Sequence, residues 1–201
     1  MPGVISPDVY IRGDTGAMRQ TDGTSDVPVN GWLGGLLYAS TAASTAVSNT
    51  TNETMFSTFA TIPANTLIAG SVIKVRYQGI ATATNSTDTL AIKLYIATAT
   101  TAGSVVGTAL ISAAALDVAD NMTFRGEALV IVRTAGASGT LVADATYKTT
   151  AAEGTHTTKY DITASKAVYT TVAQYVGVTA TWSVASSSNS CRLDVIAVEL
   201  Y

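Results

Sequence analysis

The stretch Phe59-Ala-Thr-Ile-Pro-Ala-Asn-Thr-Leu-Ile-Ala-Gly-Ser-Val-Ile-Lys-Val-Arg-Tyr77 decides the fold of this chain. A first strand stops at a turn rich in Pro, Asn and Gly, and a second strand starts beyond it. The second strand alternates between two faces, one formed by Ile73, Val75 and Tyr77 and the other by Lys74, Arg76 and Gln78. Such alternation is typical of a half-buried strand in a sandwich or a barrel.

The same alternation recurs along the rest of the chain. It predicts strands over residues 55–62, 72–81, 89–96, 123–134, 140–149, 176–184 and 190–201. Residues 84–88 are expected to form a hairpin connection, and residues 135–139 a turn. In the last strand the apolar phase shifts after Val195, which indicates a β-bulge or burial on both faces. Roughly eight short strands separated by turns predict an antiparallel β-sandwich, with a jelly roll as the favoured topology.

Two segments do not follow this alternation. Residues 109–118 are rich in Ala and Leu, which predicts a short helix or a loop. Residues 149–161 are polar and are expected to form an exposed hairpin tip or a loop.

The composition narrows the classes of function. Charged residues are 12% of the 201 residues, about half the usual share of roughly 25%. The net charge is -3 and the charges are scattered singly along the sequence, so no basic patch indicates nucleic-acid binding. No apolar run approaches the roughly 20 residues of a membrane helix. The N-terminus lacks the pattern of a signal peptide, so we expect synthesis and use without Sec export.

Side chains that carry out chemistry are scarce. The single His156 cannot build a multi-histidine metal site, and no Gly-x-Ser-x-Gly elbow accompanies it. Asp117 and Asp120 frame Asn121, where an oxygen-only calcium site is an alternative that lacks EF-hand spacing. Cys191 is expected to be a buried structural thiol. The sequence therefore predicts no catalytic residue, no cofactor, no resident metal and no enzyme activity.

The first 36 residues differ from the rest in being rich in Gly and Pro and poor in apolar periodicity. They predict an extended N-terminal arm over residues 1–36, followed by a sandwich domain over residues 37–201. Trp32 either inserts into a partner or tucks the arm onto the sandwich, because interface hot spots favour Trp. The residues expected to bind a partner are Tyr10, Ile11, Arg12, Asp14, Trp32 and Leu33.

Four segments together resemble a known group of proteins. They are the stretch 59–76, Thr-Asp-Thr-Leu-Ala-Ile-Lys-Leu-Tyr95, Phe124-Arg-Gly-Glu-Ala-Leu-Val-Ile-Val-Arg-Thr134 and the closing Val-Ile-Ala-Val-Glu-Leu-Tyr201. They resemble jelly-roll structural proteins of tailed bacteriophage virions, which serve as capsid decoration (cement) proteins, head fibres or tail components. The resemblance covers roughly residues 53–201 and does not extend to residues 1–36.

This resemblance implies a non-enzymatic virion structural protein, with a capsid decoration protein as the leading hypothesis. The arm and the sandwich surfaces would bind the major capsid protein or neighbouring virion subunits, with a homotrimer favoured and neither nucleic acid nor membrane as a partner. The location implied is the capsid surface, after assembly in the host cytoplasm. The alternative is a receptor- or glycan-binding module of a phage tail fibre or adhesin. Exposed aromatics clustered on one sheet or in residues 149–161 would favour that alternative.

Overall fold

The computed structural model describes residues 8–11, 18–21, 26–28, 35–83, 87–118, 120–151 and 154–201. The chain divides into two compact units, Met1–Gly35 together with Tyr201, and Leu36–Leu200. In the first unit, three short strands pair antiparallel in chain order: β1 (Asp8–Ile11), β2 (Met18–Thr21) and β3 (Asp26–Pro28).

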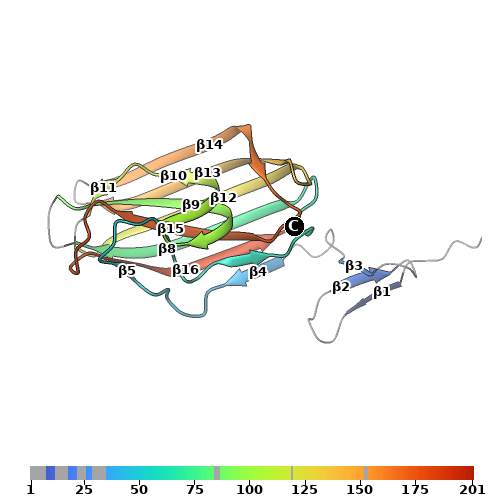
Figure 1. The fold of residues 1–201 in the computed structure, drawn as a ribbon, viewed down its shortest axis with the longest axis horizontal. Helices are drawn as coiled ribbons and strands as arrows, with labels where there is room; N and C mark the ends of the chain where they lie inside the picture. The colour runs from blue at the N-terminus through green and yellow to red at the C-terminus, as the bar shows by residue number, and fades with distance from the viewer. Residues whose placement is uncertain are drawn as a thin grey trace, which may run out of the picture. The chain divides into compact units, whose positions relative to one another are not determined.

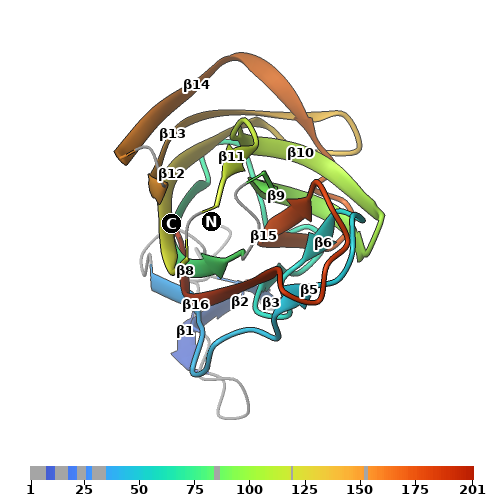
Figure 2. The same ribbon diagram turned by 90° about the vertical axis from the view of Figure 1, so that its left-hand side faces the viewer.

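The second unit consists of two antiparallel sheets packed face to face, and the larger sheet curves around the smaller one (Figures 1 and 2). The larger sheet has the order β14-β13-β12-β8-β16-β4, and β5 also pairs with β16. Its strands are β4 (Gly35–Ala39), β5 (Val47–Ser48), β8 (Val72–Thr82), β12 (Met122–Thr134), β13 (Gly139–Ala151), β14 (Gly154–Val168) and β16 (Ser190–Leu200).

The smaller sheet has the order β10-β9-β15-β6, with β11 also paired to β9 and β7 to β15. Its strands are β6 (Thr54–Met55), β7 (Ala60–Ile62), β9 (Thr89–Thr101), β10 (Ser104–Ser112), β11 (Leu116–Asp117) and β15 (Gln174–Trp182). The predicted antiparallel β-sandwich is thus confirmed. Strands β8 and β16 pair in one sheet while β9 and β15 pair in the other, the nested pairing that folding a jelly roll produces.

The side chains that the sequence predicts to face inward form the core between the two sheets. In β8, Ile73, Val75 and Tyr77 are buried, and the intervening side chains are exposed. Trp182 is buried, and its Nε1 donates a 3.1 Å hydrogen bond to the carbonyl of Val47. A buried indole N–H is costly without such a partner, so this bond lets the largest core side chain sit fully inside.

The predicted bulge in the last strand is confirmed. The register of β16 against β8 shifts between Leu193 and Val195. Leu193 and Ile196 are both buried, whereas Val195 is 51% exposed. Asp194 is the extra residue of a β-bulge. Beyond it the buried side chains fall at even-numbered positions of the strand, whereas before it they fall at odd-numbered positions.

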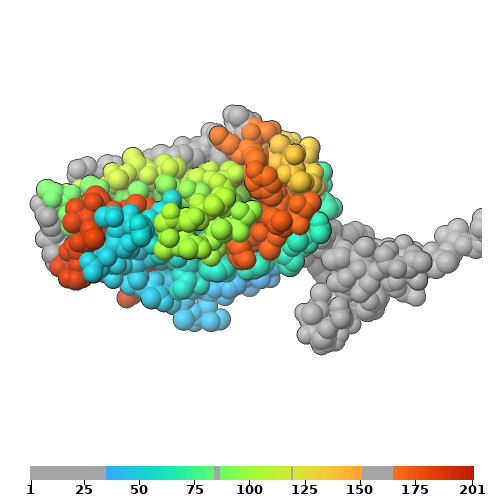
Figure 3. Space-filling view, in the orientation of Figure 1, coloured from blue at the N-terminus to red at the C-terminus, as the bar shows by residue number. Residues whose placement is uncertain are grey.

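One lateral edge of the sandwich is closed by the outermost strands of the two sheets. Thr108 in β10 donates a 2.6 Å hydrogen bond from its Oγ1 to the carbonyl of Ala167 in β14. In Figure 3 the green surface of β10 adjoins the orange surface of the end of β14. Covering a strand edge in this way removes a site for pairing with another chain.

One prediction about local structure is wrong, and another is confirmed only in part. Residues 109–118 form neither a helix nor a plain loop, because they contain the end of β10 and all of β11. Leu110 and Ile111 are buried there, so packing between the sheets overrides the helix propensity of Ala and Leu. Residues 149–161 do lie in a hairpin as expected, since Ala151 pairs with Gly154, but the β13–β14 ladder continues from that pair and makes them mostly strand and not loop.

Two further predictions about the strands and their connections are wrong. Residues 84–88 do not connect a hairpin, since β8 and β9 belong to different sheets. Asp88 ends that connection in the interior, where its Oδ2 accepts a 3.0 Å hydrogen bond from Nδ2 of Asn189. The single strand expected over 55–62 is split into β6 and β7, because Phe56 between them turns into the core.

No helix in the described part of the chain is long and apolar enough to cross a membrane.

Candidate functional site on the outer face of the larger sheet

The structure describes few of the residues expected to bind a partner. Tyr10 and Ile11 lie on β1. Arg12, Asp14, Trp32 and Leu33 lie outside the described residues. The partner-binding role of these residues remains a prediction.

The other candidate positions do not assemble into a reactive centre among the described residues. His156 lies on β14 opposite Thr149, and only its backbone is described. Within the described ranges, no three His, Cys, Asp or Glu side chains come together as a metal site, so Asp117 gains no such partners. Cys191 is buried as predicted, and burial, with a smaller effect of Asp194, strongly raises the pKa of its thiol. A thiol that stays protonated in the core acts as a small apolar side chain.

The outward side chains of β8, β12 and β13 form three parallel rows, which we call the polar face. The rows are Lys74, Arg76 and Gln78 on β8, Arg125, Glu127 and Leu129 on β12, and Asp144, Thr146 and Lys148 on β13. Six of these nine side chains are charged, in a chain where charged residues are only 12%. Charges that are scattered along the sequence are therefore gathered in space on this surface.

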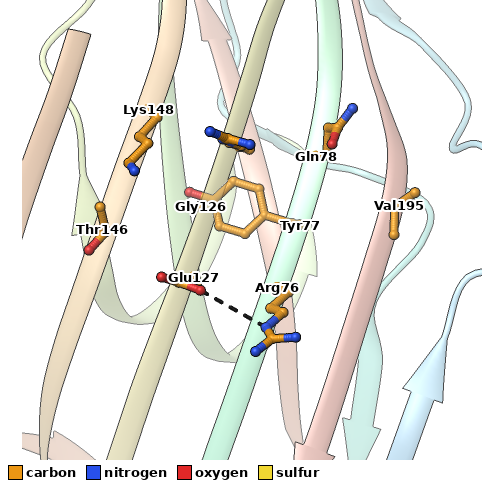
Figure 4. A pocket seen from close by; sticks show the side chains of 9 residues that line it. Arg76, Tyr77, Gln78, Gly126, Glu127, Thr146, Lys148 and Val195 are labelled. Atoms are coloured by element: carbon orange, nitrogen blue, oxygen red, sulfur yellow. Dashed lines mark ion pairs between the residues drawn. The ribbon is translucent and has the colours of Figure 1, made fainter.

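A hollow of about 430 Å³ lies at the centre of the polar face. Figure 4 shows the side chains around it, and a dashed line marks the ion pair between Arg76 and Glu127. Gly126 lies at its centre, with Tyr77 behind it, whose ring is buried on the core side of the sheet, and Val195 borders it on the β16 side. The remaining lining residues are Arg76, Gln78, Arg125, Glu127, Thr146 and Lys148.

Two smaller hollows continue the central one along the strands. A hollow of about 260 Å³ shares Gln78, Arg125 and Lys148 with it and extends to Thr123 and Thr150. A hollow of about 220 Å³ shares Arg76, Glu127 and Thr146 with it. At about 3.3 Å per residue, the part of β12 from Thr123 to Leu129 spans about 20 Å. The polar face therefore offers an elongated surface parallel to the strands.

Two contacts between an aromatic ring and a glycine on the neighbouring strand hold β8 and β12 in the register that forms the polar face. Tyr77 pairs with Gly126, and a Cβ added at Gly126 would collide with the tyrosine ring. Phe124 pairs with Gly79, and a Cβ added at Gly79 would collide with the phenylalanine ring and with the carbonyl of Arg192. A large ring covering a cross-strand glycine is a recognised way to pin strand register. A slip by one residue would turn the charged rows into the core.

The charges on the polar face are unevenly matched. Arg76 and Glu127 form a 4.0 Å ion pair with exposed side chains, and Lys74 lies opposite Glu199 in register. Arg125 lies directly opposite Lys148. Neither of these two cations has an ion pair or a hydrogen bond from its side chain within the described ranges. Like charges directly opposite each other on a sheet repel, so this pair does not stabilise the fold.

A second charged cluster lies on the outer face of the smaller sheet and is matched internally. Nζ of Lys93 lies 3.1 Å from Oε1 of Glu53, which also accepts a 2.8 Å hydrogen bond from Oγ1 of Thr179. The same ammonium lies 5.9 Å from the centre of the Tyr95 ring. Burial tends to lower the pKa of Lys93, but the hydrogen bond and charge of Glu53 raise it overall. These contacts hold β6 against the sheet and leave no unmatched charge to attract a ligand.

Comparisons with known proteins identify no family for this chain. No family model matches it, and no curated protein matches it. Among solved structures, a seed lectin of Lotus tetragonolobus gives a TM-score of 0.38 at 11% identity, covering 98% of this chain and 91% of the lectin. The acidic lectin of winged bean, complexed with methyl-α-D-galactose, gives 0.33 at 12% identity, covering 97% of this chain and 90% of the lectin. At these scores the likeness supports no statement about a ligand.

The expected kinship with phage virion proteins, the capsid and subunit partners, the trimer and the virion location all stay predictions. The part of the expectation that the structure confirms is the antiparallel β-sandwich.

Proposed function

We propose that the sandwich is a recognition module that binds a glycan along the polar face of its larger sheet. The observation that carries the proposal is the row of three adjoining hollows, lined by charged and hydrogen-bonding side chains of β8, β12 and β13. The central hollow, at about 430 Å³, falls within the usual range of roughly 300–1,000 Å³ for small-ligand sites. Its elongated continuation suits a linear chain of sugar units better than a single compact ligand.

The chemistry of the lining supports hydrogen-bonded recognition. Gln78 and Thr146 supply groups that both donate and accept hydrogen bonds, Glu127 accepts them, and Arg76 donates them. The aromatic stacking expected of many glycan sites is missing from this surface. Among the described residues, the strongly exposed aromatic side chains are Tyr169 and Tyr201, and neither lines a hollow. Binding would therefore depend on polar groups and not on ring stacking.

The proposal concerns binding alone, and no bond-breaking step is assigned to the polar face. It corresponds to the receptor- or glycan-binding alternative of the sequence analysis. The capsid decoration hypothesis assigns binding to both the arm and the sandwich surfaces, so the two hypotheses are separated by testing whether the chain binds a glycan or a phage capsid.

The test is a glycan array probed with the full chain, followed by titration of the best binder observed by amide NMR. We expect resonances of β8, β12 and β13 to shift. The double variant Gln78→Ala, Glu127→Ala is expected to weaken binding about tenfold or more, since two polar contacts are lost. Arg133→Ala is the matched control, because Arg133 is an exposed cation of β12 that lines none of the three hollows.

Two outcomes would overturn the proposal. One is the absence of binding to any glycan while the chain co-sediments with phage capsids, which would support the decoration hypothesis instead. The other is glycan binding whose NMR shifts lie on the smaller sheet and which the double variant leaves unchanged.

A further inference from the structure

The ligand class follows from the cations of the polar face, if the proposed glycan binding is correct. We infer that Arg125 and Lys148 form a subsite for an anionic group, so that the preferred glycan carries carboxylates or sulfates.

The first step concerns the juxtaposition of the two cations. Arg125 on β12 and Lys148 on β13 are register partners, and both belong to the outward rows of the sheet. Directly opposite residues have Cβ atoms roughly 5 Å apart, so the two charged groups reach the same volume of solvent. Two positive charges in one small volume raise the local concentration of anions there.

The second step concerns the partners of the other cations. Arg76 is paired with Glu127, Lys93 with Glu53, and the Nε of Arg192 donates a 2.7 Å hydrogen bond to Asp194. Arg125 and Lys148, like Arg133 and Lys166, have no such carboxylate among the described residues, and what sets Arg125 and Lys148 apart is that they face each other in register. The guanidinium of Arg125 and the ammonium of Lys148 repel each other, and an anion between them would turn this repulsion into two attractive contacts.

The third step concerns the surroundings of the pair. Arg125 and Lys148 line both the central hollow and the hollow of about 260 Å³, so they stand where the two meet. The smaller hollow contains no acidic residue in its lining, which otherwise includes Gln78, Thr123 and Thr150. Gln78 is the register partner of Arg125 on its other side. A guanidinium fork, an ammonium and an amide thus surround one place, a donor set that matches the oxygens of a carboxylate or sulfate.

The fourth step concerns the selectivity that this arrangement predicts. Arg76 and Glu127 beside the subsite are mutually compensated, so they offer hydrogen bonds to hydroxyl groups without adding net charge. The anionic group would be fixed by Arg125 and Lys148 while neighbouring sugar hydroxyls meet the compensated pair. A polymer with one anion per sugar unit or per few units would fit this layout.

The experiment compares matched glycans that differ in charge, using the full chain and isothermal titration calorimetry. The probes are an oligogalacturonate and its fully methyl-esterified form, and dextran sulfate and unmodified dextran. We expect at least one acidic probe to bind about tenfold more tightly than its neutral partner, because a charge-assisted contact is worth roughly a factor of ten. We also expect that preference to shrink as salt is raised, since the site is exposed and is screened by ions.

Two variants and one control locate the effect. Arg125→Gln and Lys148→Gln are each expected to weaken binding of the acidic probe about tenfold more than binding of its neutral partner, so that the preference for the acidic probe shrinks about tenfold. Arg133→Gln, which removes a cation of the same strand outside the hollows, is expected to leave the preference intact. Circular dichroism spectra of all the variants check that each remains folded.

The outcomes separate this inference from the proposed function. Equal binding of acidic and neutral probes overturns the anionic subsite but leaves glycan binding standing. A charge preference that survives both Arg125→Gln and Lys148→Gln also overturns it. Binding of dextran sulfate without oligogalacturonate supports the subsite and identifies sulfate as its group, and the reverse identifies carboxylate. Absence of binding to every glycan on the array overturns the proposed function, and the subsite with it.

Discussion

The two sheets carry charged clusters on their outer faces, and the clusters differ in how their charges are compensated. On the smaller sheet, Glu53 contacts both Lys93 and Thr179, and the side chains of Lys93 and Glu53 are only 27% and 22% exposed. On the larger sheet, the Arg76–Glu127 pair is 78% and 67% exposed, and Arg125 faces Lys148. The first cluster is built to hold a short edge strand in place, whereas the second contributes little to the fold.

This difference is informative because exposed ion pairs stabilise a protein only slightly, by about 0–1 kcal/mol. Charged side chains that add little to the stability of the fold are candidates for a role in binding. If the comparison is correct, substitutions on the smaller sheet should change stability, and substitutions on the polar face should change binding.

The largest effect on the free energy of unfolding is expected at a glycine whose surroundings leave no space for a side chain. Gly79→Ala on the larger sheet should destabilise the protein by about 1–3 kcal/mol, because its Cβ meets the Phe124 ring and a carbonyl that cannot yield. Gly177→Ala on the smaller sheet is the matched control, since its Cβ meets chiefly the flexible Met55 side chain and the Cβ of Phe59. Urea unfolding measures both. If Gly177→Ala cost as much as Gly79→Ala, the larger sheet would not be the more tightly registered one.

An intermediate effect is expected from the compensated cluster, and it depends on pH. The pKa of Lys93 is raised from 10.5 overall by Glu53 against the effect of burial, and the pKa of Tyr95 is raised from 10.0 by burial and by Glu53. A raised pKa means that the stabilisation is complete below the ordinary value and is lost as the pH rises through the raised one. Glu53→Gln should therefore cost about 1 kcal/mol near neutral pH and should reduce the loss of stability above about pH 10.

Urea unfolding at neutral and alkaline pH measures this prediction. Glu127→Gln is the control, because the exposed Arg76–Glu127 pair should contribute almost nothing at either pH. Equal losses in the two variants would contradict the distinction between the clusters.

The smallest effect on stability is expected at the uncompensated pair. Arg125→Gln should leave the free energy of unfolding unchanged or raise it by about 0.3 kcal/mol, because it removes a repulsion across the β12–β13 ladder. Thermal unfolding without ligand measures the change, with Arg133→Gln as the reference. A loss of about 1 kcal/mol or more would show that Arg125 supports the sheet, and the comparison between the two faces would fail.

The sequence predicted the sandwich well wherever one face of a strand is polar and the other apolar. The alternating burial of β8 and β12, the buried Cys191 and the bulge of β16 are all confirmed. The errors lie where local composition and tertiary packing disagree. The Ala-rich segment around Leu110 becomes strand because a neighbouring strand pairs with it, and Phe56 splits a predicted strand because the core accepts its ring.

The candidate site was not predicted, although a signal for it exists. Arg125 and Lys148 lie at outward positions on the two strands that flank the turn 135–139. Counting outward from the turn would have paired them approximately. A register shift between Val132 and Thr134 in β12 makes such counting unreliable from sequence alone. Without the register, each cation appears as an isolated charge on its own strand.

Alternation of side chains along each strand is a local property, so the sequence by itself determined that this is an all-β chain with a two-sided pattern. It also determined which side chains face the core, because burial follows the period of two. Which strands are neighbours is a non-local property, and only the tertiary structure decided it. That choice brought Arg125 against Lys148 and left Glu53 with Lys93, and so separated a surface on which like charges face each other from one whose charges are matched.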